Sequence, residues 1–192
     1  MRLSRSAGRR PTGIRRVAGL LVVLLLLAGC TGRPTGVHVV RDFQLERYLG
    51  LWYEVARLDH GFERGLVDVT AEYGLSAEGR VTVVNRGLRA ESCRWEEVAG
   101  EARLQGEAGT ASLSVTFFWP FAGGYHVIAL DRDDYGWAMV AGPTRGFLWI
   151  LARSPELDAS VLERLVEQAD GLGFDTDALI LVEHGTSGCP AD

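Results

Sequence analysis

The chain has 192 residues, of which 47% are hydrophobic and 23% are charged. This length and composition are typical of a single globular domain. Residues 1–16 contain six arginines and no acid, so 14 basic and 25 acidic residues remain after residue 29, a net charge of −11. A surface of that charge repels nucleic acids and anionic headgroups, which argues against nucleic-acid binding.

The N-terminus has the pattern of an export signal. Basic residues 1–16 precede an apolar run at 17–28, which at twelve residues is shorter than the roughly 20 that span a bilayer. The run ends in Leu27-Ala28-Gly29-Cys30, which resembles the lipobox of bacterial lipoproteins. The resemblance implies cleavage before Cys30 and acylation of this cysteine with palmitate-like chains, which anchor a protein stably. The alternative is an ordinary secretory signal followed by an incidental cysteine.

These features divide the chain into a lipoprotein signal peptide at 1–29, a lipid-anchored tether at 30–40 and one domain at 41–192. Within the domain, apolar and polar residues alternate with a period of two and are separated by Gly, Pro and Asp turns. The pattern predicts eight strands, at 52–58, 67–75, 81–84, 95–104, 113–117, 125–131, 137–142 and 147–153. Short connections favour antiparallel neighbours, and eight such strands close into an up-and-down β-barrel with room for one small ligand.

One stretch has helical periodicity. Six apolar residues between Val161 and Leu172 fall on one face of a predicted helix at 158–172, with Asp158 as N-cap and Gly173 beyond its end. We expect this helix to pack outside the barrel rather than on a membrane. A short run at 178–182 predicts a ninth strand.

Two cysteines remain besides Cys30. The export signal places Cys93 and Cys189 in an oxidising compartment, where such a pair usually forms a disulfide. The alternative is two free thiols, one of them catalytic, but no Cys-x-x-Cys spacing or neighbouring His supports it.

With Gly50-Leu51-Trp52 opening the first strand and Arg153 ending the eighth, the chain resembles the lipocalin family. The stretches 48–65, 117–131 and 141–153 are similar to the bacterial outer-membrane lipocalins, which are lipid-anchored and resemble apolipoprotein D. The resemblance implies a calyx whose closed end holds Trp52 beneath Arg153, with Gly50 and the turn at Asp131 beside them. It also places Cys93 and Cys189 where many lipocalins bridge the sheet to the C-terminal segment. The turn itself departs from the family pattern, because Asp133-Asp134-Tyr135 stands where Thr-Asp-Tyr is common.

Candidate ligand-binding residues follow from strand alternation, because residues i and i+2 share a face. Taking Trp52 as inward-facing, the alternation gives a mainly apolar set suited to an elongated hydrophobe. A β-bulge would shift the inward face of a strand by one residue. At each position, an equal alternative is that the side chain only fills the barrel core and does not contact a ligand. The set comprises Glu54, Ala56, Leu58, Val69, Ala71, Tyr73, Val83, Asn85, Val115, Phe117, Tyr125, Val127, Val140, Phe147 and Trp149.

The predicted function is binding or transport of a small hydrophobic molecule in the cell envelope, and the resemblance implies the fatty acid or lysophospholipid class. We expect no enzyme, cofactor or metal, because the sequence has no phosphate loop, no nucleophile elbow and no metal-like cluster.

The predicted membrane attachment is through Cys30. It lies at the outer membrane if the host has two membranes, and otherwise on the outer face of the cell membrane. The sequence leaves a homodimer open. One alternative is a lipid- or isoprenoid-directed enzyme using Glu54 and Tyr125 as acid and base. Another is a structural protein whose barrel is filled by Trp149, Phe117 and Tyr125.

Overall fold

A computed structural model describes residues 31–185 and Cys189. The signal peptide predicted at 1–29 and Cys30, the predicted site of acylation, lie outside the described residues. No helix among the described residues is long and apolar enough to cross a membrane.

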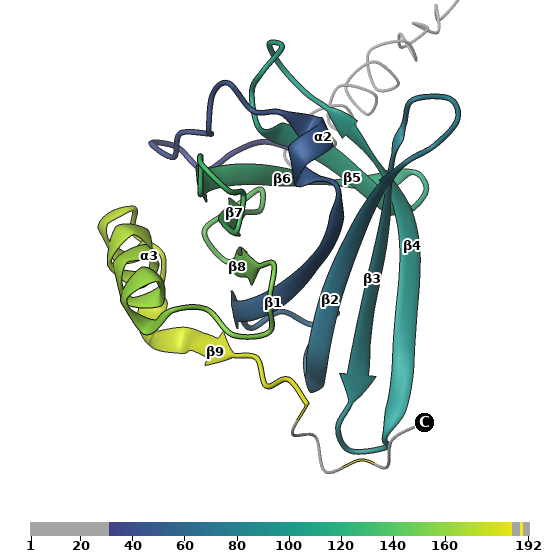
Figure 1. Cartoon of the computed structure of the whole chain (residues 1–192), viewed down its shortest axis with the longest axis vertical. Coiled ribbons are helices and arrows are strands. Elements are labelled where there is room, and N and C mark those ends of the chain that lie inside the picture. Colours follow the sequence, from purple (N-terminus) through teal and green to yellow (C-terminus); the bar gives the residue numbers. More distant parts are fainter. Residues whose placement is uncertain (1–30, 186–188, 190–192) are drawn as a thin grey trace, which may run out of the picture.

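The described chain forms one antiparallel sheet that closes on itself (Figure 1). Its strand order is β2-β3-β4-β5-β6-β7-β8-β1-β9, and an additional pairing of β1 with β2 closes the barrel, for example at Trp52 opposite Ala71. The eight-stranded up-and-down barrel is therefore confirmed. The barrel strands are β1 (Gly50–Leu58), β2 (Leu66–Leu75), β3 (Val81–Arg89), β4 (Arg94–Leu104), β5 (Ser112–Phe118), β6 (Phe121–Leu130), β7 (Trp137–Ala141) and β8 (Leu148–Ala152).

The ninth strand is also present. β9 (Leu179–Leu181) follows the 3-10 turn η1 (Thr176–Ala178) and pairs with β1 at Ala56, Arg57 and Leu58. Because β2 pairs with β1 only up to Tyr53, β9 takes the strand edge that β2 leaves near the end of β1.

A hydrophobic layer outside the barrel holds the helix α3 (Ala159–Gly171). Leu165 and Ala169 are fully buried and pack with apolar residues of β1, β7 and β8. The Asp158 side chain caps the helix by accepting hydrogen bonds from the amides of Ser160 and Val161. Figure 1 shows α3 on the side of the barrel formed by β7, β8 and β9, away from the long strands β2, β3 and β4.

Residues 31–40, which belong to the tether predicted at 30–40, pack against the barrel. Val37 and Val40 are buried, and the backbone of Val40 exchanges hydrogen bonds with Val127 and Ala111. These apolar side chains gain more by packing on the barrel than by remaining in water. The segment therefore runs along the wall of the barrel and leads into the short helix α2 (Leu45–Tyr48), which lies near the start of β1.

The disulfide between Cys93 and Cys189 is present, so the free-thiol alternative does not apply. It joins the β3–β4 turn to the C-terminal tail, across 96 residues of sequence.

Candidate ligand-binding cavity

The closed end of the barrel is built around Trp52, which is fully buried. The Arg153 guanidinium lies 3.9 Å from the centre of the indole ring and donates to the carbonyl oxygens of Leu51 and Leu49 at 2.8 and 2.9 Å. Gly50 has φ +94°, and a Cβ there would meet an Arg153 nitrogen at 3.5 Å, so glycine suits both the backbone and the contact.

The β6–β7 turn adjoins this arrangement. The Asp131 carboxylate accepts from the amides of Asp133 and Gly136, and Arg153 Nε donates to the carbonyl oxygen of Tyr135. The structure thus brings Gly50, Trp52, Asp131 and Arg153 together at one end of the barrel, despite the unusual turn sequence.

Three tyrosines lie above this closed end. The Tyr125 hydroxyl is 2.7 Å from that of Tyr48 and accepts from that of Tyr73 at 2.8 Å. Burial is the main cause that raises the pKa of all three phenols, so they stay neutral. The hydroxyls therefore satisfy one another, and Tyr73 and Tyr125 line the space above.

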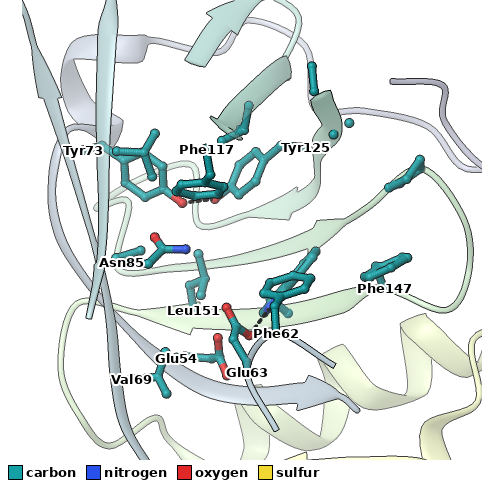
Figure 2. A pocket seen from close by; sticks show the side chains of 18 of the residues that line it. Glu54, Phe62, Glu63, Val69, Tyr73, Asn85, Phe117, Tyr125, Phe147 and Leu151 are labelled. Carbon is teal, nitrogen blue, oxygen red and sulfur yellow. Dashed lines mark hydrogen bonds between the residues drawn. The ribbon is translucent and has the colours of Figure 1, made fainter. Parts of the chain in front are cut away.

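That space is a cavity of about 480 Å³, within the range of roughly 300–1,000 Å³ that is typical of small-molecule sites. Figure 2 shows Tyr73, Tyr125 and Phe117 at one end of it and Glu54, Glu63 and Phe62 toward the other. Because the aromatic residues line the cavity and leave it open, they do not fill the barrel as the structural alternative required.

Most of the alternation-derived set lines this cavity: Glu54, Val69, Ala71, Tyr73, Val83, Asn85, Val115, Phe117, Tyr125, Phe147 and Trp149. Val127 and Val140 do not line it. Both are fully buried in the barrel core with Trp52, Ala138 and Leu151, so they support the closed half of the barrel.

The inward orientation predicted for Ala56 and Leu58 is wrong. The pairing of β1 with β8 shifts register between Glu54 and Ala56, which marks a β-bulge. A bulge moves the following residues to the opposite face. Ala56 and Leu58 consequently pack outside the barrel in the layer beneath α3.

The bulge turns Arg57 to a buried position, where it is only 2% exposed. Its guanidinium donates to Glu54 Oε1 at 2.7 Å and to the carbonyl oxygens of Glu63 and Leu66 at 3.1 and 3.0 Å. Sequence alternation missed this residue because its strand position predicts an outward side chain.

Glu63 is the second acid of this cluster. Its Oε2 accepts from the Trp149 indole at 3.1 Å and lies 3.0 Å from His60 Nε2. Burial raises the pKa of Glu63, but His60, Trp149 and Arg57 together outweigh burial, so its pKa is lowered. For Glu54, burial and then the charge of Glu63 raise the pKa well above its usual value, more than Arg57 lowers it. Arg57 thus contacts the carboxylate of Glu54 and the backbone of Glu63, and of the two acids it is Glu54 whose pKa is raised.

Other cavity residues come from segments without strand periodicity. Phe62 and Glu63 belong to the β1–β2 loop, and Phe118 and Phe121 flank the β5–β6 turn. The only signal in the sequence is the aromatic density of residues 117–121. Leu151, which the alternation also turns inward, lines the cavity as well.

A second hollow of about 390 Å³ adjoins the first and shares Phe62, Glu63, Asn85, Phe117 and Phe118 with it. It lies against β3 and the first part of β4. This part of β4 has no strand on its other side, because β5 pairs with β4 only from Glu101 onward. The cavity therefore widens sideways toward a polar wall that includes Glu96 and Glu97.

The proposed acid–base pair of Glu54 and Tyr125 is not brought together. Glu54 contacts Arg57 and Tyr125 contacts two other tyrosines, in different parts of the cavity (Figure 2). No group of three or more residues able to hold a metal ion occurs within 31–185 and Cys189.

Comparison with known proteins matches residues 43–184 to the Lipocalin-like domain. The chain is 45% identical over 169 residues to the outer membrane lipoprotein Blc of Vibrio cholerae, covering 88% of this chain and 99% of the relative. It is 47% identical over 151 residues to Blc of Escherichia coli, covering 79% and 85%, and 30% identical over 184 residues to apolipoprotein D of Bos taurus, covering 86% and 95%.

Solved structures of similar fold include insecticyanin of Manduca sexta, with a TM-score of 0.67 at 20% identity. That similarity covers 83% of this chain and 90% of insecticyanin, and it supports the fold alone. The family match and the bacterial relatives, which agree with the barrel and its closed end, show that this chain belongs to the lipocalin family.

Proposed function

We propose that the protein is a lipid-anchored carrier that binds a single-chain lipid in the bacterial cell envelope. The observation that supports this most is the cavity itself, which is walled by aliphatic and aromatic side chains and has its ionisable groups gathered toward one side. An acyl chain gains by leaving water for such a wall, at about 0.8 kcal/mol for each buried methylene.

The polar cluster favours a lysophospholipid over a free fatty acid. The terminal nitrogens of Arg57 already donate to Glu54, Glu63 and Leu66, so they are poorly placed to pair with a ligand carboxylate. The ionised Glu63 would repel such a carboxylate and attract an ammonium headgroup. Burial and Glu63 raise the pKa of Glu54, which favours its protonated form, and a protonated carboxyl group can donate to an ester or phosphate oxygen.

The envelope location rests on the lipobox at Cys30 and on the relatives, which are named outer membrane lipoproteins. In a host with two membranes, the acyl chains would hold the barrel at the periplasmic face of the outer membrane. The fold and these relatives favour a carrier without catalytic activity.

Tryptophan fluorescence titration of delipidated protein, supported by native mass spectrometry, tests the ligand class. We expect lysophosphatidylethanolamine to bind roughly tenfold more tightly than palmitate at neutral pH, a difference of about 1.4 kcal/mol. Ala71→Phe places a ring in the cavity and should weaken both ligands by at least about tenfold. Glu72→Phe is the matched control, because Glu72 is the next residue on β2 and is exposed.

Two results would count against the proposal. The first is an absence of saturable binding for either lipid. The second is equal weakening by the two phenylalanine variants, which would place the lipid outside the cavity.

A further inference from the structure

The tip of the β5–β6 hairpin exposes an unusual amount of aromatic surface. Trp119 is 88% exposed, Phe118 is 72% exposed and Phe121 is 71% exposed. Phe62 of the neighbouring β1–β2 loop is 61% exposed and lines the same cavity as the two hairpin phenylalanines. Contiguous exposed aromatic side chains of this kind mark a binding surface.

The hairpin is also free of charge. No residue from 112 to 125 is acidic or basic, although the chain beyond residue 29 carries a net charge of −11. A segment without ionised groups enters a lipid interface without the cost of desolvating a charge. Trp and Phe are the side chains that favour this depth of a bilayer.

The N-terminal segment approaches the barrel near the same tip. His126 Nε2 donates to the carbonyl oxygen of Gly32 at 2.7 Å. The carbonyl oxygens of Gly32 and Thr31 lie 2.8 and 3.0 Å from where a Cβ would stand on Gly124. Gly124 is three residues from Phe121 along β6, a distance of about 10 Å.

Cys30 directly precedes Thr31, and consecutive Cα atoms are about 3.8 Å apart. An anchor on Cys30 therefore attaches to the barrel within roughly 20 Å of the aromatic tip. A bilayer that holds the acyl chains lies within reach of the hairpin.

We propose that the tip at Phe118–Phe121 inserts into the interface of the bilayer that holds the anchor. This rests on the lipid anchor of the proposed function, and it adds a defined orientation of the barrel on the membrane. Phe118 and Phe121 line the cavity and lie at the tip, so they connect the membrane to the cavity by an apolar surface. An acyl chain can pass between bilayer and cavity along them with little exposure to water.

Trp119 is a direct probe of this contact, because it is the most exposed of the tip residues and does not line the cavity. The lipoprotein is reconstituted into phosphatidylcholine vesicles with or without phosphatidylcholine brominated on its acyl chains. The difference in emission between wild type and Trp119→Phe isolates this indole from the other four tryptophans. We expect brominated lipid to quench this Trp119 emission by about half. We also expect aqueous acrylamide to quench the Trp119 emission several-fold less in the presence of the bilayer than in its absence.

Leu75→Trp in the Trp119→Phe background is the matched control. Leu75 is 53% exposed and ends β2, at the opposite end of the barrel from the tip. In this variant the indole at position 75 lies at the end of the barrel away from the tip. Brominated lipid should therefore not quench its emission, whereas acrylamide should.

A second preparation separates this inference from the anchor. The chain beginning at Cys30 is made without acylation, and the Cys30 thiol is coupled to a maleimide lipid in the same vesicles. If the protein produced in cells does not stay on vesicles but the coupled protein does, the proposed acylation of Cys30 is wrong. The coupled protein still shows whether the tip inserts into the bilayer. Lipid binding, measured without vesicles, is independent of both.

Two outcomes overturn the proposal. One is a Trp119 signal that brominated lipid leaves unchanged and acrylamide quenches as strongly as the Leu75→Trp control. The other is protection from acrylamide without quenching by brominated lipid, together with dimers in solution, since a second copy of the chain would then cover the tip.

Discussion

Arg57 shows how a single side chain organises the candidate site. It is almost fully buried, it donates a hydrogen bond to Glu54, and it ties the β1–β2 loop and the start of β2 to β1 through two carbonyl oxygens. A buried charge is tolerated only with such partners, because burial of an ionised group without them costs several kcal/mol. The loop that carries Phe62 and Glu63 is therefore held over the cavity by an arginine from the adjacent strand.

Glu54 should make stability depend on pH. Its pKa is raised in the folded protein by burial and by Glu63, so the folded state binds this proton more tightly than the unfolded state. Stability is therefore lost as pH rises from the unfolded pKa of about 4.3 toward the folded pKa. Glu54→Gln cannot ionise and retains an oxygen for Arg57, so it should escape this loss.

Urea unfolding of both proteins at about pH 4.5 and pH 7.5 measures the effect. We expect the stability of Glu54→Gln relative to wild type to increase with pH, by about 1.4 kcal/mol for each unit by which folding raises the pKa. If the free energy of unfolding changed with pH by the same amount in both proteins, Glu54 would be ionised in the native barrel.

Arg153 performs a comparable structural role at the other end of the barrel. Besides stacking on Trp52, it donates to carbonyl oxygens of Arg47, Leu49, Leu51 and Tyr135. These residues precede β1 or belong to its start and to the β6–β7 turn, so one guanidinium joins the start of β1 to the end of β8. A lysine could not replace it, because an ammonium lacks the planar fork of donors.

At the scale of elements, a helix, a strand and a disulfide connect the C-terminal part of the chain to the barrel. α3 packs its apolar face on β1, β7 and β8, and β9 pairs with the end of β1. Beyond β9, the Cys93–Cys189 disulfide attaches the tail to the β3–β4 turn. Before that point, Glu183 and Gly185 already hydrogen-bond to Asp68, so the chain after β9 reaches the strand β2.

Removal of this disulfide should destabilise the protein without changing the barrel. For a loop of 96 residues the chain-entropy model gives about 4–5 kcal/mol, because the bridge restricts the unfolded chain. We expect Cys93→Ala/Cys189→Ala to lower the free energy of unfolding in urea by up to this amount, with an unchanged far-UV circular dichroism spectrum. An unchanged unfolding midpoint would mean that the bridge does not restrict the unfolded chain.

At the scale of the whole molecule, the protein maintains a cavity of about 480 Å³ inside its core. The unfilled space forgoes the dispersion contacts that a packed core would make, so the empty barrel is less stable than it could be. A lipid that fills the cavity binds only the folded state, and its binding energy adds to the free energy of unfolding.

This linkage predicts a thermal shift. A lysophospholipid at 100 times its dissociation constant should stabilise the wild-type protein by about 2.7 kcal/mol. Ala71→Phe should respond far less at the same lipid concentration, while Glu72→Phe should respond as wild type does. Differential scanning calorimetry below the critical micelle concentration measures the shift, and equal responses in the two variants would contradict binding inside the barrel.

Much of this organisation follows from local sequence. The period-two alternation and the turn residues are strictly local signals, so they predicted the eight strands, the ninth strand and the helix. The inward faces of β2, β3 and β5 were also predicted, because Tyr73, Val83 and Val115 lie in regularly alternating runs.

The rest depends on contacts between distant segments. The bulge in β1 arises from pairing with β8, nearly 100 residues away, and it exchanges Ala56 for Arg57 on the inner face. Glu63 enters the site from a loop, and its ionisation depends on His60 and Trp149. Strand periodicity therefore sufficed to predict a barrel with an apolar interior. The charges at the site and the position of the aromatic tip near Thr31 and Gly32 required the tertiary structure, since both result from segments that meet only in the folded chain.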